Sequence, residues 1–283
     1  MERGKEDCHI HMVLDGENWK AAIQRHENGP DLTWIRGILE RYANAGYDYL
    51  RDGGDRWGVG AAARSLAGEY GIRYRTPLAP LYHKGHYGSF IGVGFENVRE
   101  YRELVCKNRE KDFVKIMISG LMDFDRFGVL TQPGLSAGEI RELVHIAHEE
   151  GYAVMAHANG AEVVRSAAEA GVDSVEHGAY LDGEALHAMA ENGTVWVPTL
   201  STIGNLRGKG RFDETAVEQI LESAMENASK FAAMGGLVAE GSDAGAWAVP
   251  HAAGTERTLL TQAIGENVEE VLRRGGEKIR EKF

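Results

Sequence analysis

The sequence predicts a single-domain α/β protein, a (β/α)8 TIM barrel that spans residues 1–283. Short apolar runs alternate with amphipathic segments, and no proline-rich linker, low-complexity tract or block of like charge interrupts them. This alternation is typical of βα units. The length is near the roughly 250 residues of such a barrel. At 43% apolar residues, the chain can also bury one large core.

Eight apolar runs are expected to form the strands, and eight is the number that closes a barrel. All but the first follow a segment that can form a helix. The runs are centred near Ile10, Tyr49, Tyr74, Lys115, Val154, Ser174, Trp196 and Val238.

Two segments show how the helices are encoded. Residues 136–150 combine a capping box of Ser136 and Glu139 with an i, i+3, i+4, i+7 apolar stripe, and Gly151 follows as a stop. Residues 31–46 begin with an aspartate that can cap a helix and carry a similar apolar face. Each segment directly precedes an apolar run, so helix and strand alternate as a barrel requires.

Composition argues for a small-molecule partner. A formal charge of −12 and a sequence pI of 5.4, without any basic run interleaved with aromatics, disfavour a nucleic-acid partner. Residues 1–7 are polar and lack the apolar stretch of a signal peptide, and no run approaches the roughly 18 apolar residues of a membrane span. Two cysteines are too few for a disulfide framework. We therefore expect a soluble, cytoplasmic protein with no membrane partner.

Ionisable residues recur inside or just after the predicted strands. His9 and His11 are two apart, so on a strand they share a face and can bind one ion together. In a barrel, the carboxyl ends of the strands meet at one face. Imidazole and carboxylate ligands suit Zn, Mn, Fe or Ni, and no oxygen-rich calcium loop is present. The metal-ligand candidates are His9, His11, Lys115, His157, His177 and Asp243.

Three of these candidates also have an ordinary structural explanation. Lys115 could leave the barrel and pair with Asp112 or Glu139 on a helix interface. His177 could be a hydrogen-bonded core residue, and Asp243 could cap a helix after the last strand. The side chains must therefore converge in the folded protein for the metal hypothesis to hold.

Two other features are left out of the predicted site. His145 and His148 have an H-x-x-H spacing, but they lie in the 136–150 helix, which should pack on the outside of the barrel. Cys8 should face away from His9 on the first strand, so it is expected to pack as a small apolar residue.

The segment at residues 80–88 is predicted to be a loop at the catalytic rim. It is dense in aromatic side chains and polar donors, and such loops usually determine specificity. Its candidate substrate-binding residues are Tyr82, His83, His86 and Tyr87. Three arginines, Arg75, Arg207 and Arg211, could bind a substrate carboxylate, although surface positions are the common outcome for arginine.

Taken in order, these motifs resemble the amidohydrolase superfamily, in particular its prolidase-like and imidazolonepropionase-like branch. The resemblance covers almost the whole chain. It is carried by His9-Ile10-His11, VKIMISG at 114–120, AHANG at 156–160, DSVEHG at 173–178 with Leu181-Asp182, PTL at 198–200 and GSDAG at 241–245.

The resemblance implies a binuclear centre, expected to hold two zinc ions. Lys115 would be carbamylated and bridge both ions, with His9, His11 and Asp243 on the first and His157 and His177 on the second. A metal-bridging hydroxide would then attack an amide, peptide or cyclic-amide carbonyl, with Asp243 acting as general base and then as general acid. The segment Gly85-His86-Tyr87-Gly88 is similar to one that places a histidine over the substrate carbonyl, so His86 is the second catalytic candidate.

Two alternative functions stay open at this point. One is a mononuclear metal-dependent deaminase or imidazolone-type ring hydrolase, and the other is a non-catalytic metal-binding barrel. The substrate is also open among an N-acyl amino acid, a dipeptide, a urea-like compound and a cyclic amide. Members of the branch usually begin with a small β-sandwich, whereas eight residues precede His9, so no separate sandwich domain is expected. A homo-oligomer could cover that end of the barrel.

Overall fold

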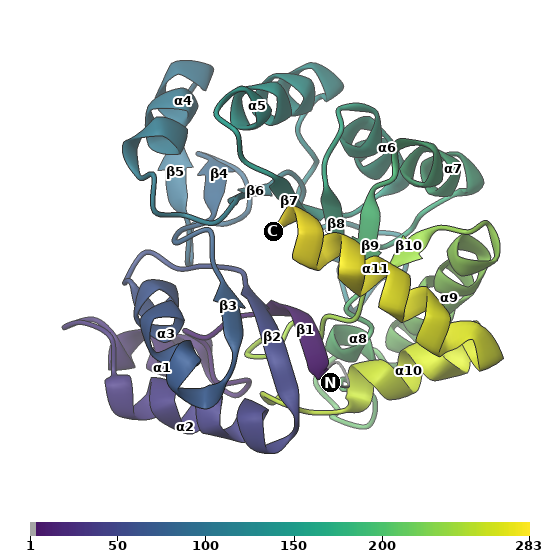
Figure 1. Ribbon diagram of the computed structural model, residues 1–283. Helices are drawn as coiled ribbons and strands as arrows, with labels where there is room; N and C mark the ends of the chain where they lie inside the picture. The colour runs from purple at the N-terminus through teal and green to yellow at the C-terminus, as the bar shows by residue number, and fades with distance from the viewer. Residues whose placement is uncertain (1–3) are drawn as a thin grey trace.

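Parallel strands form the inner layer of the protein in a computed structural model that describes residues 4–283 (Figure 1). Residues 1–3, the start of the polar N-terminal segment, lie outside this description. All eight predicted runs form strands, and two short strands, β4 and β5, are added. The strands are β1 (Lys5–Ile10), β2 (Tyr47–Asp52), β3 (Arg73–Arg75), β4 (Leu81–His83), β5 (Val93–Phe95), β6 (Val114–Met117), β7 (Val154–Ala158), β8 (Ser174–His177), β9 (Val195–Val197) and β10 (Leu237–Val238).

The strands form two ladders that together make the barrel wall. One ladder has the order β1-β2-β3, and the other has the order β10-β9-β8-β7-β6-β4-β5. At one junction, Asp243 N after β10 donates to His9 O in β1 over 2.7 Å. At the other junction, Asp112 N before β6 donates to Thr76 O after β3 over 3.0 Å. These backbone hydrogen bonds connect the ends of the two ladders at both junctions.

The third barrel position is split between two strands. β3 pairs with β2, whereas β4 pairs with β6 through Leu81 and Ile116, and β5 adds to β4 at the edge. The prediction of a loop over the whole of 80–88 is therefore wrong for Leu81–His83. Pro77 and Pro80 separate the two halves because proline has no N–H to donate to a ladder.

Helices surround the strands, and the two segments analysed above form helices as predicted. Asp31 caps α2 through Thr33 N and Trp34 N, and the Ser136–Glu139 capping box is present at the start of α5. Within residues 4–283, no helix is both long and apolar enough to cross a membrane. The helices are α1 (Trp19–Arg25), α2 (Leu32–Asn44), α3 (Val59–Ala67), α4 (Val98–Lys107), α5 (Ala137–Glu149), α6 (Ala161–Glu169), α7 (Gly183–Asn192), α8 (Ser201–Gly204), α9 (Glu214–Ala233), α10 (Thr255–Ile264) and α11 (Val268–Lys282).

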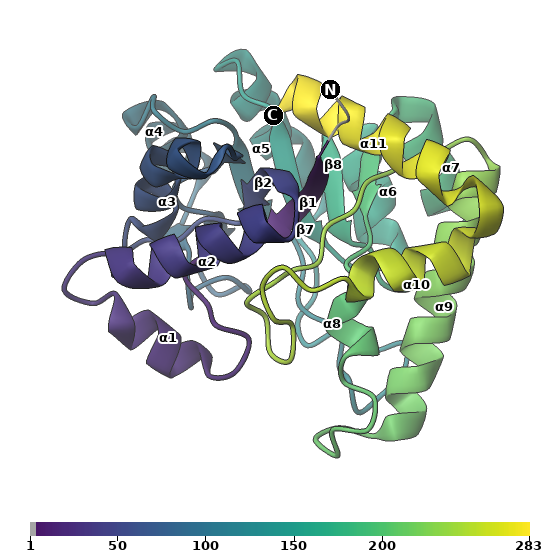
Figure 2. The same cartoon turned by 60° about the horizontal axis from the view of Figure 1, so that its bottom comes forward.

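The C-terminal helix α11 covers the amino ends of the strands (Figures 1 and 2). Ile279 and Phe283 are buried in one cluster with inward-facing residues of the strands, among them Cys8. Arg280 Nε lies 2.8 Å from Glu6 Oε2, and Lys282 pairs with a carboxylate at the start of β8. A helix of the same chain therefore covers the end that the sequence analysis assigned to oligomer contacts. A homo-oligomer stays a prediction.

Candidate metal centre and cavity

Three of the predicted ligands lie at the carboxyl ends of β1 and β10. His9 and His11 come from β1 and the residue after it, and Asp243 follows β10. Ligand atoms of these three residues all lie within 4.8 Å of one another. Asp243 Oδ1 is 3.2 Å from His11 Nε2 and 3.5 Å from His9 Nε2. The strand order thus brings together groups that are more than two hundred residues apart in the sequence.

The other three predicted ligands adjoin this group from β6, β7 and β8. Lys115 Nζ lies 3.1 Å from His9 Nε2. The rings of His157 and His177 have centroids 4.5 Å apart, and the His177 ring is 5.1 Å from that of His9. Lys115 therefore points into the barrel, whereas Asp112, its alternative partner in the sequence, pairs with arginines.

Buried atoms without hydrogen bonds and backbone strain in this group of residues are typical of a site that can bind a cation. His11 Nδ1 is buried and has no hydrogen-bond partner among the described residues, and the buried Asp243 Oδ1 makes no well-aligned hydrogen bond there, although two imidazole nitrogens lie 3.2 Å and 3.5 Å away. Buried polar atoms are nearly always partnered in folded proteins, so these two atoms in one cluster fit coordination to a cation. His177 and Asp243 also have left-handed φ values of 70° and 58°, a strain that is typical of functional sites.

Burial disfavours the protonated form of His9, His157 and His177. It lowers the pKa of His157 to about 3, with the Lys115 charge as the next cause, and it lowers the pKa of His9 and His177 well below the ordinary value. Neutral imidazole is the form that binds a metal. Burial also lowers the pKa of Lys115 to about 8, so more of this amine is uncharged near neutral pH than for an exposed lysine.

Glu176 and Arg51 hold His9 in place, and the sequence analysis missed both. His9 Nδ1 lies 2.7 Å from Glu176 Oε2, which leaves Nε2 free to face the site. Glu176 Oε1 accepts from Arg51 Nη2 over 2.8 Å and from Ser174 Oγ over 2.6 Å, and both charged side chains are fully buried. The signal that could have found them is a charged residue within a buried strand run.

Loops after the strands contact two of the other three imidazoles, those of His157 and His177. His157 Nε2 lies 3.3 Å from Gly120 O, which also accepts from Asn159 Nδ2 over 3.1 Å. His177 Nδ1 lies 2.8 Å from Thr199 Oγ1. Each ring therefore keeps one fixed orientation before any ion binds.

A cavity of about 700 Å³ is lined by five of the six residues, His11, Lys115, His157, His177 and Asp243, whereas His9 lies buried behind them. His86 and Tyr87 line it, and the Tyr87 ring lies 4.9 Å from that of His157. Tyr82 and His83 do not line it, so the structure does not support their predicted contact with substrate. Both belong to β4, where the Tyr82 side chain packs close to Gly88 and His83 packs on Phe95 and His86.

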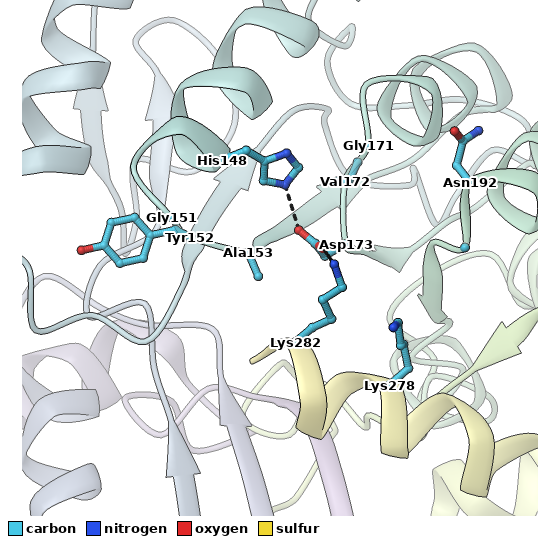
Figure 3. Close-up of a pocket in the computed structure, with 11 residues that line it drawn as sticks. His148, Gly151, Tyr152, Ala153, Gly171, Val172, Asp173, Asn192, Lys278 and Lys282 are labelled. Carbon is cyan, nitrogen blue, oxygen red and sulfur yellow. Dashed lines mark hydrogen bonds and ion pairs between the residues drawn. The ribbon is translucent and has the colours of Figure 1, made fainter.

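A second hollow of about 670 Å³ lies at the opposite end of the barrel (Figure 3). There, His148 Nε2 lies 3.0 Å from Asp173 Oδ2, and Lys282 Nζ lies 3.0 Å from Asp173 Oδ1. His145 pairs with Glu149 on the helix surface. Among the described residues, His145 and His148 belong to no group whose geometry suits a metal, and the absence of metal binding there stays a prediction.

The fold and the site together define a class, a parallel α/β barrel with imidazole, amine and carboxylate groups gathered at the carboxyl ends of its strands. The chain belongs to the amidohydrolase family, whose model matches residues 63–273. That range includes Lys115, His157, His177 and Asp243.

The individual relatives share less than 30% of their residues with this chain. Ochratoxinase of Aspergillus niger is 27% identical over 233 residues, which is 71% of this chain and 48% of that protein. The chain thus spans about half the length of the curated relatives that it matches first. Among solved structures, a Xaa-Pro dipeptidase with bound methionine in the active site has a TM-score of 0.79 at 22% identity, over 98% of this chain and 75% of that one. The A. niger ochratoxinase structure has a TM-score of 0.76 at 19% identity, over 96% of this chain and 70% of that one. These structural likenesses establish the fold.

Proposed function

We propose that this chain is a metal-dependent hydrolase that cleaves an amide, peptide or cyclic-amide C–N bond. The observation that carries the proposal is the convergence of His9, His11 and Asp243 within 4.8 Å, with Lys115 beside them. The family membership and the amide-cleaving names of its relatives support it. The substrate is a small molecule, because the cavity over the site holds about 700 Å³.

The donor set fits two divalent cations, for which we propose zinc, with Mn, Fe or Ni as substitutes. When bound, such ions lower the pKa of a coordinated water and polarise a carbonyl. His9, His11 and Asp243 would hold the first ion, His157 and His177 the second, and Lys115 both.

Lys115 would take part as a carbamate. Its neutral amine adds carbon dioxide, which forms one N–C bond and releases one proton, and the product is an anionic oxygen donor. An ammonium at the same place would repel cations. The buried position of Lys115, 3.1 Å from His9 Nε2, supports this role, because a carbamate formed on Nζ would lie beside the imidazoles.

Asp243 would move the proton. Its Oδ1 faces His9 and His11, which leaves Oδ2, 4.0 Å from His177 Nδ1, to accept a proton from the attacking water. The same oxygen can then give that proton to the leaving nitrogen. His86, which lines the cavity, would hydrogen-bond the substrate carbonyl.

Metal stoichiometry tests this proposal. We expect elemental analysis of protein purified in bicarbonate to give about two ions per chain, and Lys115→Ala to hold fewer. Lys111→Ala is the matched control, because Lys111 is also buried but donates to Val105 O away from the site. Unchanged stoichiometry in Lys115→Ala would remove the bridge from the proposal.

One observation favours a second candidate, a mononuclear deaminase or imidazolone-type hydrolase. Within the described residues, the only group whose geometry suits a metal is His9, His11 and Asp243, which is enough for one ion. A single ion per chain with a free lysine, seen in the mass spectrum, would select this candidate. Bound metal without turnover of any amide, lactam or aminated ring would select a non-catalytic barrel. A cytoplasmic location and a homo-oligomer stay predictions from the sequence.

A further inference from the structure

One of the three arginine candidates, Arg211, lines the cavity over the metal centre. Arg75 Nη1 lies 3.0 Å from Asp112 Oδ1, and Arg207 Nη1 lies 3.7 Å from Glu218 Oε1, both outside the cavity. Arg211 has no ion pair within residues 4–283. The structure therefore selects, among three positions that the sequence left equal, the one that could meet a substrate anion.

An aromatic wall holds Arg211 in place. Its guanidinium carbon lies over the Trp247 ring, 4.3 Å from the centroid, and 5.2 Å from the centroid of Phe212. Phe212 itself contacts Trp247 edge-on at 6.1 Å and Phe124 at 5.2 Å. Stacking engages the face of a guanidinium and leaves its N–H edge free, the edge that binds a carboxylate through two parallel hydrogen bonds.

The rest of the cavity favours large apolar groups. Trp19 contacts Phe90 edge-on at 6.1 Å, and Phe90 contacts Tyr87 at 5.6 Å, so a second aromatic wall extends from the rim to the metal centre. Trp19 is half exposed although it is large and apolar. Met117 and Leu206 also line the space. Such a lining suits an aromatic or bulky aliphatic ligand.

We propose that the substrate is an N-acyl amino acid with a free carboxylate and a bulky apolar acyl group, and that Arg211 binds the carboxylate. This inference rests on the proposed amide hydrolysis. The carboxylate neutralises the charge of Arg211. The aromatic walls contact the apolar acyl group on one side of the scissile bond and the amino-acid side chain on the other. A cyclic amide or urea-like compound offers Arg211 no anion.

A pair of matched substrates tests the inference in the zinc-loaded protein. N-benzoyl-phenylalanine carries the carboxylate, and N-benzoyl-phenylalaninamide has the same shape without the charge; release of benzoate is measured for both. For wild type, we expect kcat/KM to be about 10- to 100-fold higher for the carboxylate, the usual worth of a charge-assisted hydrogen-bond pair. In Arg211→Met this preference should vanish, mainly through a higher KM for the carboxylate compound.

Two controls accompany the variant. Arg207→Met removes a neighbouring arginine that lies outside the cavity, and we expect it to leave both rates unchanged. Zinc content should be the same in wild type and Arg211→Met, which shows that the metal centre is intact.

The outcomes separate the two levels of the proposal. Equal rates for the two compounds in wild type, or an unchanged preference in Arg211→Met, would overturn the role of Arg211 while amide hydrolysis stands. Turnover of cyclic amides alone would overturn the substrate class. If the zinc-loaded protein cleaved no amide of any kind, the proposed function itself would fall, and this inference with it.

Discussion

The substitution Glu176→Gln tests how the metal centre is supported. The Glu176 carboxylate contacts His9 on one side and Arg51 on the other, at 2.7 Å and 2.8 Å, and none of the three side chains is exposed to solvent. Glutamine keeps the size but removes the charge and one acceptor oxygen. Its NH2 group must then face the donor of either His9 or Arg51, so one buried hydrogen bond is lost and the guanidinium keeps no counter-ion.

The size of the effect follows from this burial. Removing one partner of a buried ion pair costs about 3–5 kcal/mol. With an unfolding entropy of about 2.1 cal/mol/K per residue, the 283 residues give about 600 cal/mol/K. The melting temperature of the metal-free protein should therefore fall by about 5–8 °C. Losing the outer partner of a ligating histidine should also weaken zinc binding about 10- to 100-fold.

The assay has two readouts, the melting temperature from circular dichroism without metal and the zinc affinity from competition with a chelator. Glu184→Gln is the matched control, since Glu184 pairs with Arg165 on the surface, and its melting temperature should change by less than about 1 °C. The double variant Glu176→Gln, Arg51→Met removes the unpaired charge and lets the amide oxygen face His9. Its losses should be smaller than the sum of the two single losses.

Two results would refute the reasoning. The first is a Glu176→Gln protein with the melting temperature and zinc affinity of wild type, because the carboxylate would then not support His9. The second is strict additivity in the double variant, because the charge of Arg51 would then be independent of Glu176.

Two further predictions follow from other parts of the structure. A Cβ at Gly53 would lie 2.3 Å from His11 Cε1 and 2.8 Å from Lys115 Nζ, so Gly53→Ala should lower the zinc content. Gly37→Ala is the control, because a Cβ at Gly37 on α2 meets open space and the zinc content should be unchanged. Equal zinc content in the two variants would contradict the prediction. Burial raises the pKa of Glu256 to about 8, so the folded protein keeps a proton that the unfolded chain loses near pH 4.3, and the stability from this residue falls as pH rises from about 4.5 to about 8. As pH rises across that range, the melting temperature of wild type should therefore fall relative to that of Glu256→Gln. A difference between the two melting temperatures that does not change with pH would contradict the raised pKa of Glu256.

Much of the fold was predictable because it depends on local patterns. The capping box at Ser136 and the apolar stripe that follows it are read directly from neighbouring residues, and α5 forms there. The third predicted strand forms around Tyr74, but the two short strands that follow it, β4 and β5, were not predicted. Leu81–His83 is too short and too polar to give an apolar signal, and it is a strand because its backbone meets β6, a contact that depends on the tertiary arrangement.

The candidate site also contains residues that the sequence could indicate and residues that only the fold selects. His86 and Tyr87 line the cavity, so their contact with substrate stays a prediction, whereas their neighbours Tyr82 and His83 lie in β4 and do not line it. The choice of Arg211 over Arg75 and Arg207 also depends on the fold. Ion-pair partners come from distant segments, and a single sequence gives no distance between them.

The sequence by itself determined the alternation of helices and strands, the order of the predicted ligand residues and the resemblance to the amidohydrolase superfamily, because each of these depends on neighbouring residues or on their order. Only the tertiary structure brought His9 to Asp243 and Lys115, paired Glu176 with Arg51 behind them, and placed α11 over the amino ends of the strands. These contacts join residues from different strands and helices. They exist only once the parallel strands have assembled into one barrel around a common core.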